Sequence, residues 1–170
     1  MTDFLQFNGI SKGYPGVQAL SDVSFSVRKG AVHGLMGENG AGKSTLIKII
    51  SGVHSPDSGE MTVDGKPVFF SSPREAAAAG IATVYQELLL FPDLTVAENI
   101  YLGHAPRRRS GRLNWPEIRG GARALLDDLE SPDLDVDARV GSLSVANRQR
   151  VEIAKALSQN ARFLIMDEPT

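Results

Sequence analysis

The chain has 170 residues, of which 42% are hydrophobic and 22% are charged, and its formal net charge is −2. These values are typical of a soluble globular domain with a sizeable core, and they exclude a disordered tail, a collagen-like repeat and a highly basic nucleic-acid coat protein. The absence of cysteine excludes a disulfide scaffold and a cysteine zinc site.

The first third of the chain has the patterns that predict strands and hairpins. Residues 23–27 alternate between apolar and serine side chains, as half-buried strands do. Residues 31–36 form a short and mostly apolar segment, which predicts a buried strand with His33 in or near it. Residues 62–70 predict a hairpin with a tight Asp-Gly turn.

Residues 37–44 fit the pattern G-x-x-x-x-G-K-S, which predicts a loop around the phosphates of a nucleoside triphosphate. Glycines let backbone N–H groups turn toward an anion, and a helix predicted over residues 43–50 adds the positive end of its dipole. Lys43 can reach the β- and γ-phosphates, and the Ser44 hydroxyl can bind Mg²⁺. The residues expected to bind nucleotide are Gly37, Glu38, Asn39, Gly40, Ala41, Gly42, Lys43, Ser44 and Thr45. Small-molecule kinases, GTPases, recombinases and transporter motors share such a loop, so it leaves the class of protein open.

A helix is predicted after this region, where the chain has the residues that begin and end helices. Ser72 can serve as the cap, Pro73 suits the first helical position, and Glu75 completes a capping box. Gly80 ends the helix, and residues 81–85 predict another strand.

Two further helix starts follow. Thr95 and Glu98 form a second capping box, and Asn114 with Glu117 is a candidate for a third. Between them, residues 106–112 contain four arginines, which indicates a solvated loop. A contact of this loop with a protein partner or with acidic lipid is the alternative.

The end of the chain returns to a helix followed by a strand. Ser144 can cap a helix that runs to about residue 158, and residues 163–166 predict a short apolar strand. Asp167 and Glu168 follow that strand, where Asp167 can hold Mg²⁺ through water and Glu168 can polarise an attacking water. This order of strand, glycine loop, helix and acid-tipped strand predicts a parallel α/β core.

The segment before the acid pair resembles the L-S-x-G-x-x-Q signature of ATP-binding-cassette (ABC) ATPases. The matching residues are Leu143, Ser144, Val145, Ala146, Asn147, Arg148 and Gln149, and Ala146 stands where the family usually has glycine. Tyr14 resembles the aromatic residue that stacks on adenine in this family. Gln86 resembles the glutamine that touches magnesium and the attacking water and couples to the membrane subunit. The resemblance covers residues 5–170.

Three further segments resemble the ATP-binding subunits of importers for simple sugars such as ribose, galactose, xylose or arabinose. They are residues 86–88, 94–103 and 151–157. In those subunits two cassettes are usually fused, and this chain would match the front part of the first one.

The resemblance implies an α/β P-loop NTPase fold: a RecA-like parallel core, an N-terminal antiparallel β subdomain and a helical subdomain. Residues 1–170 would form one ABC ATP-binding domain, with residues 87–158 as the helical subdomain. The family continues beyond its Asp-Glu-Pro-Thr segment with a D-loop and a switch histidine. We therefore expect a cassette truncated after the acid-tipped (Walker B) strand, which binds ATP but is impaired in hydrolysis.

The resemblance also implies the cofactors and partners. ATP and Mg²⁺ would lie between the phosphate loop of one cassette and the signature of a second, in a head-to-tail dimer. Lys43, Gln86 and Glu168 would be catalytic, and Ser44, Gln86 and Asp167 would hold the metal. Membrane permease subunits would bind the cassette directly at the cytoplasmic face, as a peripheral protein, and a periplasmic sugar-binding protein would act indirectly. No apolar stretch approaches the ~18 residues of a membrane span, so another component would anchor it.

Three other functions are alternatives to sugar import. A soluble ABC-type ATPase of DNA repair or translation would show coiled-coil heptads, a zinc hook or basic arms, and the slightly negative charge argues against nucleic acid as a partner. A small-molecule kinase would leave Gln86 and residues 143–149 unexplained. A folding module without turnover is the alternative that is not an enzyme.

Overall fold

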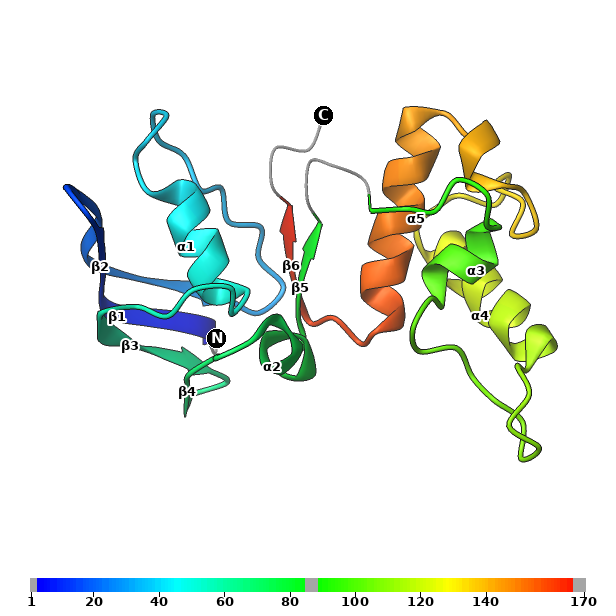
Figure 1. Ribbon diagram of the computed structural model, residues 1–170, viewed down its shortest axis with the longest axis horizontal. Helices are drawn as coiled ribbons and strands as arrows, with labels where there is room; N and C mark the ends of the chain where they lie inside the picture. Colours follow the sequence, from blue (N-terminus) through cyan, green and yellow to red (C-terminus); the bar gives the residue numbers. More distant parts are fainter. Residues whose placement is uncertain (1–2, 85–88, 167–170) are drawn as a thin grey trace. The chain divides into compact units, whose positions relative to one another are not determined.

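The computed structural model describes residues 3–84 and 89–166 of the chain. By its internal contacts the chain divides into two compact units, Met1–Ile81 and Ala82–Thr170 (Figure 1). Each unit has its own secondary structure and buried core, and each is described here by itself.

The first unit is built on an antiparallel sheet. Its strands are β1 (Asp3–Tyr14), β2 (Val17–Arg28), β3 (Ser58–Val63) and β4 (Lys66–Val68), in the order β2-β1-β3-β4. Phe7 pairs with Phe25 on one side and with Met61 on the other, and the two phenylalanine rings stack with centroids 4.5 Å apart. The predicted hairpin is confirmed, because Asp64 and Gly65 have the positive φ angles, 51° and 72°, that tight hairpin turns require.

Two helices accompany this sheet. Helix α1 (Lys43–Ile50) has the predicted bounds, and it buries Leu46, Ile47, Ile49 and Ile50. Helix α2 (Pro73–Ala78) begins with proline in its first turn, as predicted, but its capping box does not form. The Ser72 side chain makes no cap hydrogen bond, and the Glu75 carboxylate instead accepts hydrogen bonds of 2.8 Å from the backbone N–H and the hydroxyl of Ser71.

The second unit combines a small sheet with three helices. Strands β5 (Ile81–Val84) and β6 (Phe163–Met166) pair, and their arrows run parallel in Figure 1. Helices α3 (Val96–Ile100), α4 (Trp115–Asp128) and α5 (Val145–Ser158) pack together, and a 3₁₀ turn (Val140–Ser142) precedes α5. The buried residues of this core are Val96, Ala97, Ile100, Ile118, Ala122, Leu126, Leu134, Val140, Val151 and Ala154.

The start of α3 is held by two sets of polar contacts. The predicted capping box is confirmed: Glu98 N–H donates to the Thr95 hydroxyl, and Thr95 N–H donates to the Glu98 carboxylate. The fully buried amide of Asn99 receives the N–H of Phe91 and donates to the carbonyls of Phe91 and Thr95. At α4 the predicted box is absent, because the Asn114 amide donates to the Glu117 carboxylate instead of capping the backbone.

The predicted buried strand over residues 31–36 is wrong. The segment is not a strand, all of its residues are exposed, and Met36 retains 90% of its accessible surface. His33 is also exposed and stacks on Phe25, with ring centroids 5.4 Å apart. Burial of a parallel strand requires a hydrogen-bonding neighbour, and no described strand pairs with these residues.

An antiparallel β subdomain, a parallel sheet and a group of helices are therefore present, as the α/β P-loop fold requires. Among residues 3–84 and 89–166, no helix has the length and apolarity needed to cross a membrane.

Candidate nucleotide-binding site

The glycine-rich segment between residues 37 and 43 folds into a loop that closes on its own lysine. The Lys43 ammonium donates hydrogen bonds to the carbonyl oxygens of Gly37, at 2.6 Å, and Glu38, at 2.8 Å. The N–H of Ala41 donates to the same Glu38 carbonyl at 3.1 Å, which makes a turn inside the loop. The Lys43 ammonium, the only cationic group of the loop, therefore lies against the loop backbone, where it could contact a bound anion.

The N-terminus of α1 opens from this loop with free donors. The first backbone hydrogen bond runs from Leu46 N–H to the Gly42 carbonyl, so the N–H groups of residues 43–45 have no partner within the helix. Gly42 is the N-cap and has no side chain to accept from them, and the first turn contains no acid. These donors and the helix dipole together favour an anion.

Gly42 also explains how the loop sits in the first unit. Its φ angle is 87°, and a Cβ atom there would collide with the carbonyl oxygen of Ala19 and the side chain of Leu20, both in β2. The start of α1 is therefore packed directly against that strand, which fixes the direction in which the N–H groups point.

This donor set fits the polyphosphate of a nucleotide. It combines one ammonium group with several backbone N–H groups and excludes carboxylates from the first helical turn. The Ser44 side chain is exposed at the same turn, where its hydroxyl could bind Mg²⁺. The other predicted metal ligands, Gln86 and Asp167, and the predicted base Glu168 lie outside the described residues. Within the described part of the chain, no cluster of three or more histidine or acidic residues could hold a metal.

Tyr14, the predicted adenine platform, lies at the end of β1 in the same unit as the loop. Its ring is 39% exposed, and it has an edge contact with His54, with ring centroids 6.0 Å apart. Asp57 supports this end of β1, since its carboxylate accepts from the Lys12 ammonium at 2.6 Å and from Gly13 N–H at 2.8 Å. The Gly13 N–H, and then Lys12, lower the pKa of Asp57 below its usual value.

Sequence reasoning missed Asp57, because no motif marks it and its partners lie more than forty residues away. The only feature in the sequence that could have indicated Asp57 is its place directly before β3, the strand that pairs with β1.

The signature residues lie at the start of α5 in the second unit. Ser144 is the N-cap, as predicted, and its hydroxyl accepts from Asn147 N–H at 3.3 Å. Val145 and Ala146 follow in the first turn, and both are exposed. Ala146 has helical surroundings that suit alanine better than glycine. Leu143 precedes the cap, and its carbonyl accepts from the Arg148 guanidinium at 3.0 Å.

Farther along, α5 binds the backbone of Leu89, the first described residue after the Gln86 segment. The Lys155 ammonium donates to the Leu89 carbonyl at 2.9 Å, and the Glu152 carboxylate accepts from the Leu89 N–H. Burial raises the pKa of Glu152, and the Lys155 charge and the Leu89 N–H only partly oppose this. Within the described residues, the Glu152 Oε1 atom is buried without a hydrogen-bond partner. The sequence did not predict these contacts of Glu152 and Lys155, because residues 151–157 were identified only by their resemblance to sugar importers.

The structure therefore places Tyr14 and residues 37–45 in the first unit. The residues of the signature that lie together in the second unit are Leu143, Ser144, Val145, Ala146 and Gln149.

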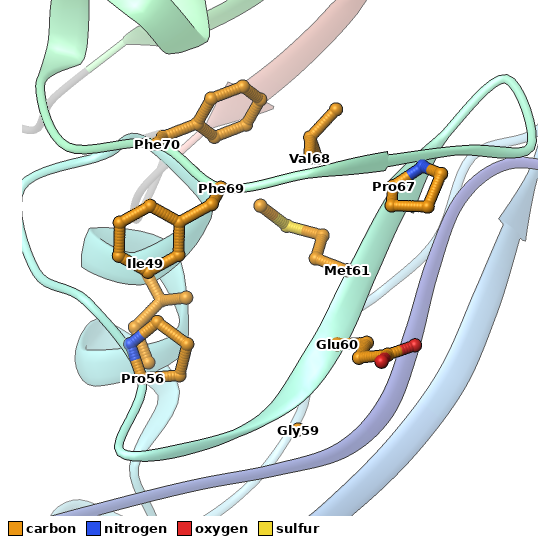
Figure 2. Close-up of a pocket in the computed structure, with 9 residues that line it drawn as sticks. All are labelled: Ile49, Pro56, Gly59, Glu60, Met61, Pro67, Val68, Phe69 and Phe70. Atoms are coloured by element: carbon orange, nitrogen blue, oxygen red, sulfur yellow. The ribbon is translucent and has the colours of Figure 1, made fainter.

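A separate hollow of about 310 Å³ in the first unit lies beside β3, β4 and α1 (Figure 2). Its lining is mostly apolar, including Ile49, Met61 and Phe69, and it contains none of the loop residues. Glu60 is its only charged residue, so this hollow is unsuited to a polyphosphate.

Known proteins with related sequences show which family the chain belongs to. Residues 20–170 match the family described as ABC transporter. The chain is 55% identical, over its full length, to the arabinose import ATP-binding protein AraG of Rhizobium meliloti (strain 1021). It is 51% identical, over 98% of its length, to the ribose import ATP-binding protein RbsA 2 of Rhizobium johnstonii. It spans 33% and 32% of those two proteins, about a third of the length of the curated relatives it matches.

Solved structures agree with the sequence relatives. The ADP conformation of MJ1267, an ATP-binding cassette of an ABC transporter, superposes with a TM-score of 0.83 at 30% identity, over 99% of this chain and 70% of that one. CbiO1 from Clostridium perfringens, part of the ABC transporter complex cbiONQ, gives a TM-score of 0.83 at 28% identity, over 100% of this chain and 67% of that one. The family match, the relatives and the cassette folds agree with one another: the chain belongs to the ABC transporter family, in its ATP-binding part.

Proposed function

We propose that this chain is the nucleotide-binding part of an ABC-type ATPase that powers the import of a simple sugar. The observation that carries the proposal is the loop over residues 37–45, where Lys43 and unpartnered helix N–H groups present positive charge from one side. The printed names of the relatives, which are import proteins for arabinose and ribose, support the sugar class.

The ligand in this proposal is ATP with Mg²⁺. Lys43 neutralises charge on the β- and γ-phosphates, the N–H groups of residues 43–45 bind the phosphate oxygens, and Tyr14 stacks on the base. Bound Mg²⁺ supplies charge neutralisation at the phosphates. By their places in the family motifs, Ser44, Gln86 and Asp167 hold that ion, and Glu168 accepts the proton of the attacking water.

The partners in the proposal follow from the signature helix. The exposed first turn of α5, with Ser144, Val145 and Ala146, contacts the γ-phosphate held by a second cassette in a head-to-tail dimer. Permease subunits bind the cassette at the cytoplasmic face of the membrane, and a periplasmic sugar-binding protein acts through them. Residues 87–158 form the helical subdomain of an ATP-binding domain over residues 1–170. A role in DNA repair or translation is not favoured by the relatives.

The test is calorimetry of Mg-ATP binding to three proteins: the unaltered chain, Lys43→Ala and Lys48→Ala. Lys48 is an exposed lysine on the same helix, so it controls for the loss of one positive charge. We expect Lys43→Ala to weaken binding by about tenfold or more, the usual effect of losing hydrogen bonds to a charged group, and Lys48→Ala to change it little. Equal affinities for the two variants, or no Mg-ATP binding by the unaltered chain, would contradict the proposal.

A further inference from the structure

The arginine-rich segment between α3 and α4 is a small hairpin, which we call the arginine hairpin (residues 106–114). Arg107 and Leu113 form an antiparallel bridge, and Arg108 N–H donates to the Arg112 carbonyl at 2.8 Å. Gly111 N–H closes the turn on the Arg108 carbonyl at 2.8 Å. Figure 1 shows the segment extending away from the helices of its unit. These backbone hydrogen bonds give the arginines a fixed platform.

Among the residues that the structure describes, none is an anionic partner for the guanidinium groups of this hairpin. Arg107 donates to the carbonyl oxygen of Gly111 at 2.8 Å, and the side chains of Arg108, Arg109 and Arg112 are exposed and make no ion pair among the described residues. This concentration of positive charge contrasts with the formal net charge of −2 for the whole chain.

An apolar surface lies directly beside these charges. Trp115, the only tryptophan of the chain, is 36% exposed, and Leu102 is 39% exposed. Both line a hollow of about 340 Å³ together with Arg107. The acid in this lining, Glu98, is engaged in the capping box of α3.

Of the two nearby charged groups on α4, Arg119 forms an ion pair and Glu117 is hydrogen-bonded to a neutral amide. The Glu117 carboxylate accepts from the Asn114 amide at 2.6 Å, and the Arg119 guanidinium donates to Asp137 at 2.7 Å while lying over the Trp115 ring. Glu98 and Glu117 keep their negative charges, and the four arginines of the hairpin outnumber these two carboxylates, so the surface has an excess of positive charge.

We propose that the arginine hairpin and Trp115 form a docking surface for an anionic phospholipid bilayer. The guanidinium groups of Arg108, Arg109 and Arg112 bind lipid phosphates, for which their planar donors are suited. Trp115 and Leu102 enter the interfacial layer, where indole rings are stabilised. A bilayer satisfies all of these groups without a defined order of ligands, whereas an acidic peptide would need a matched sequence. This contact goes beyond the proposed ATPase function and does not depend on it.

The test is co-sedimentation of the chain with vesicles of phosphatidylcholine alone and with vesicles that also contain phosphatidylglycerol. We expect binding only to the anionic vesicles, and we expect Arg108→Gln with Arg109→Gln to weaken it by about tenfold or more, because each arginine near such a surface contributes substantially. The matched control is Arg74→Gln with Arg139→Gln, which removes the same charge from two exposed arginines outside the hairpin. This control should lose much less.

Trp115 supplies a second readout, because its fluorescence reports the environment of one residue. Anionic vesicles should shift its emission to shorter wavelength, and the hairpin double variant should abolish the shift.

Three results would overturn the proposal: equal losses for the two double variants, no preference for anionic vesicles, or an unchanged Trp115 spectrum on binding. Release from the vesicles by inorganic phosphate, at constant ionic strength, would identify a site for a free anion and overturn it. Binding of poly-glutamate through the hairpin, without binding to vesicles, would identify a protein partner instead. Calorimetry with Mg-ATP in the absence of lipid keeps a failure of this proposal distinct from a failure of the ATPase proposal.

Discussion

Gly40 and Gly42 are two residues apart and have nearly the same backbone conformation, with φ angles of 85° and 87°. Their surroundings differ, since a Cβ at Gly40 would point into open space, whereas one at Gly42 would collide with Ala19 and Leu20. The pattern G-x-x-x-x-G-K-S requires glycine at position 42 and allows any residue at position 40. The structure agrees with this difference, because only Gly42 approaches β2 so closely that a side chain would not fit.

These two glycines allow a matched measurement of the close approach. Gly40→Ala should lower the free energy of unfolding by about 1–2 kcal/mol, the cost of a left-handed alanine. Gly42→Ala should cost about 1–3 kcal/mol more, because the loop or β2 must move. Denaturant unfolding of both variants gives the difference, and equal losses would show that α1 does not press on β2.

Glu152 is the second residue whose surroundings matter more than its motif. Its pKa is raised by burial, so between the unfolded value near 4.5 and the raised folded value the folded chain holds more protons than the unfolded chain. The contribution of Glu152 to stability is therefore fully present below the unfolded pKa and is lost as pH rises through the folded pKa.

This sign leads to a prediction for Glu152→Gln. The difference in free energy of unfolding between the unaltered chain and the variant should shift in favour of the variant as pH rises above about 4.5, because the amide has no proton to lose. Denaturant unfolding across this pH range measures it. Glu130→Gln, which makes the same change at an exposed glutamate, is the comparison variant. A flat difference for Glu152→Gln would show that the carboxyl is not buried as described.

At the scale of elements, α4 contains two adjacent glycines with different roles. A Cβ at Gly120 would meet nothing, whereas one at Gly121 would collide with the hydroxyl of Tyr101, which follows α3. Helix propensity favours alanine at both positions by about 1 kcal/mol, so only packing separates them.

We therefore expect Gly120→Ala to raise the free energy of unfolding by about 1 kcal/mol and Gly121→Ala to lower it. Tyr101→Phe should recover part of the loss at residue 121 by removing the hydroxyl, and this double variant is the check on the cause. Thermal and denaturant unfolding measure all three. Stabilisation by Gly121→Ala would contradict the packing of α3 against α4 through Tyr101.

Elements defined by local chemistry are predictable from the sequence, and elements defined by distant neighbours are not. The bounds of α1 and the Ser144 cap of α5 follow from apolar spacing and capping residues within a few positions. Residues 31–36 have the composition of a buried strand, but pairing decides whether such a segment is a strand, and composition contains no information on its partners. Asp57 and the contacts of α5 with Leu89 were missed for the same reason, since each joins segments far apart in sequence.

At the scale of the whole molecule, the proposed recognition of a nucleotide uses two segments that are separated along the chain. Within the first unit, Tyr14 lies at the end of β1, and the start of α1 has backbone N–H groups without partners in the helix. The proposal assigns the base to the former and the phosphates to the latter.

This assignment predicts a selective effect of Tyr14→Ala. Affinity for ATP should fall by about tenfold, the usual effect of losing one base-stacking ring, and affinity for inorganic triphosphate should be unchanged. Calorimetry with both ligands measures the two effects. Equal weakening of both would show that Tyr14 supports the loop rather than the base.

The most direct test of the account is amide hydrogen exchange of the chain with and without Mg²⁺ and inorganic triphosphate. If backbone N–H groups of the loop bind the phosphates, exchange at residues 37–45 should slow when the ligand is added, and Lys43→Ala should reduce this protection. Unchanged exchange at residues 37–45 under conditions where the ligand binds would contradict the account.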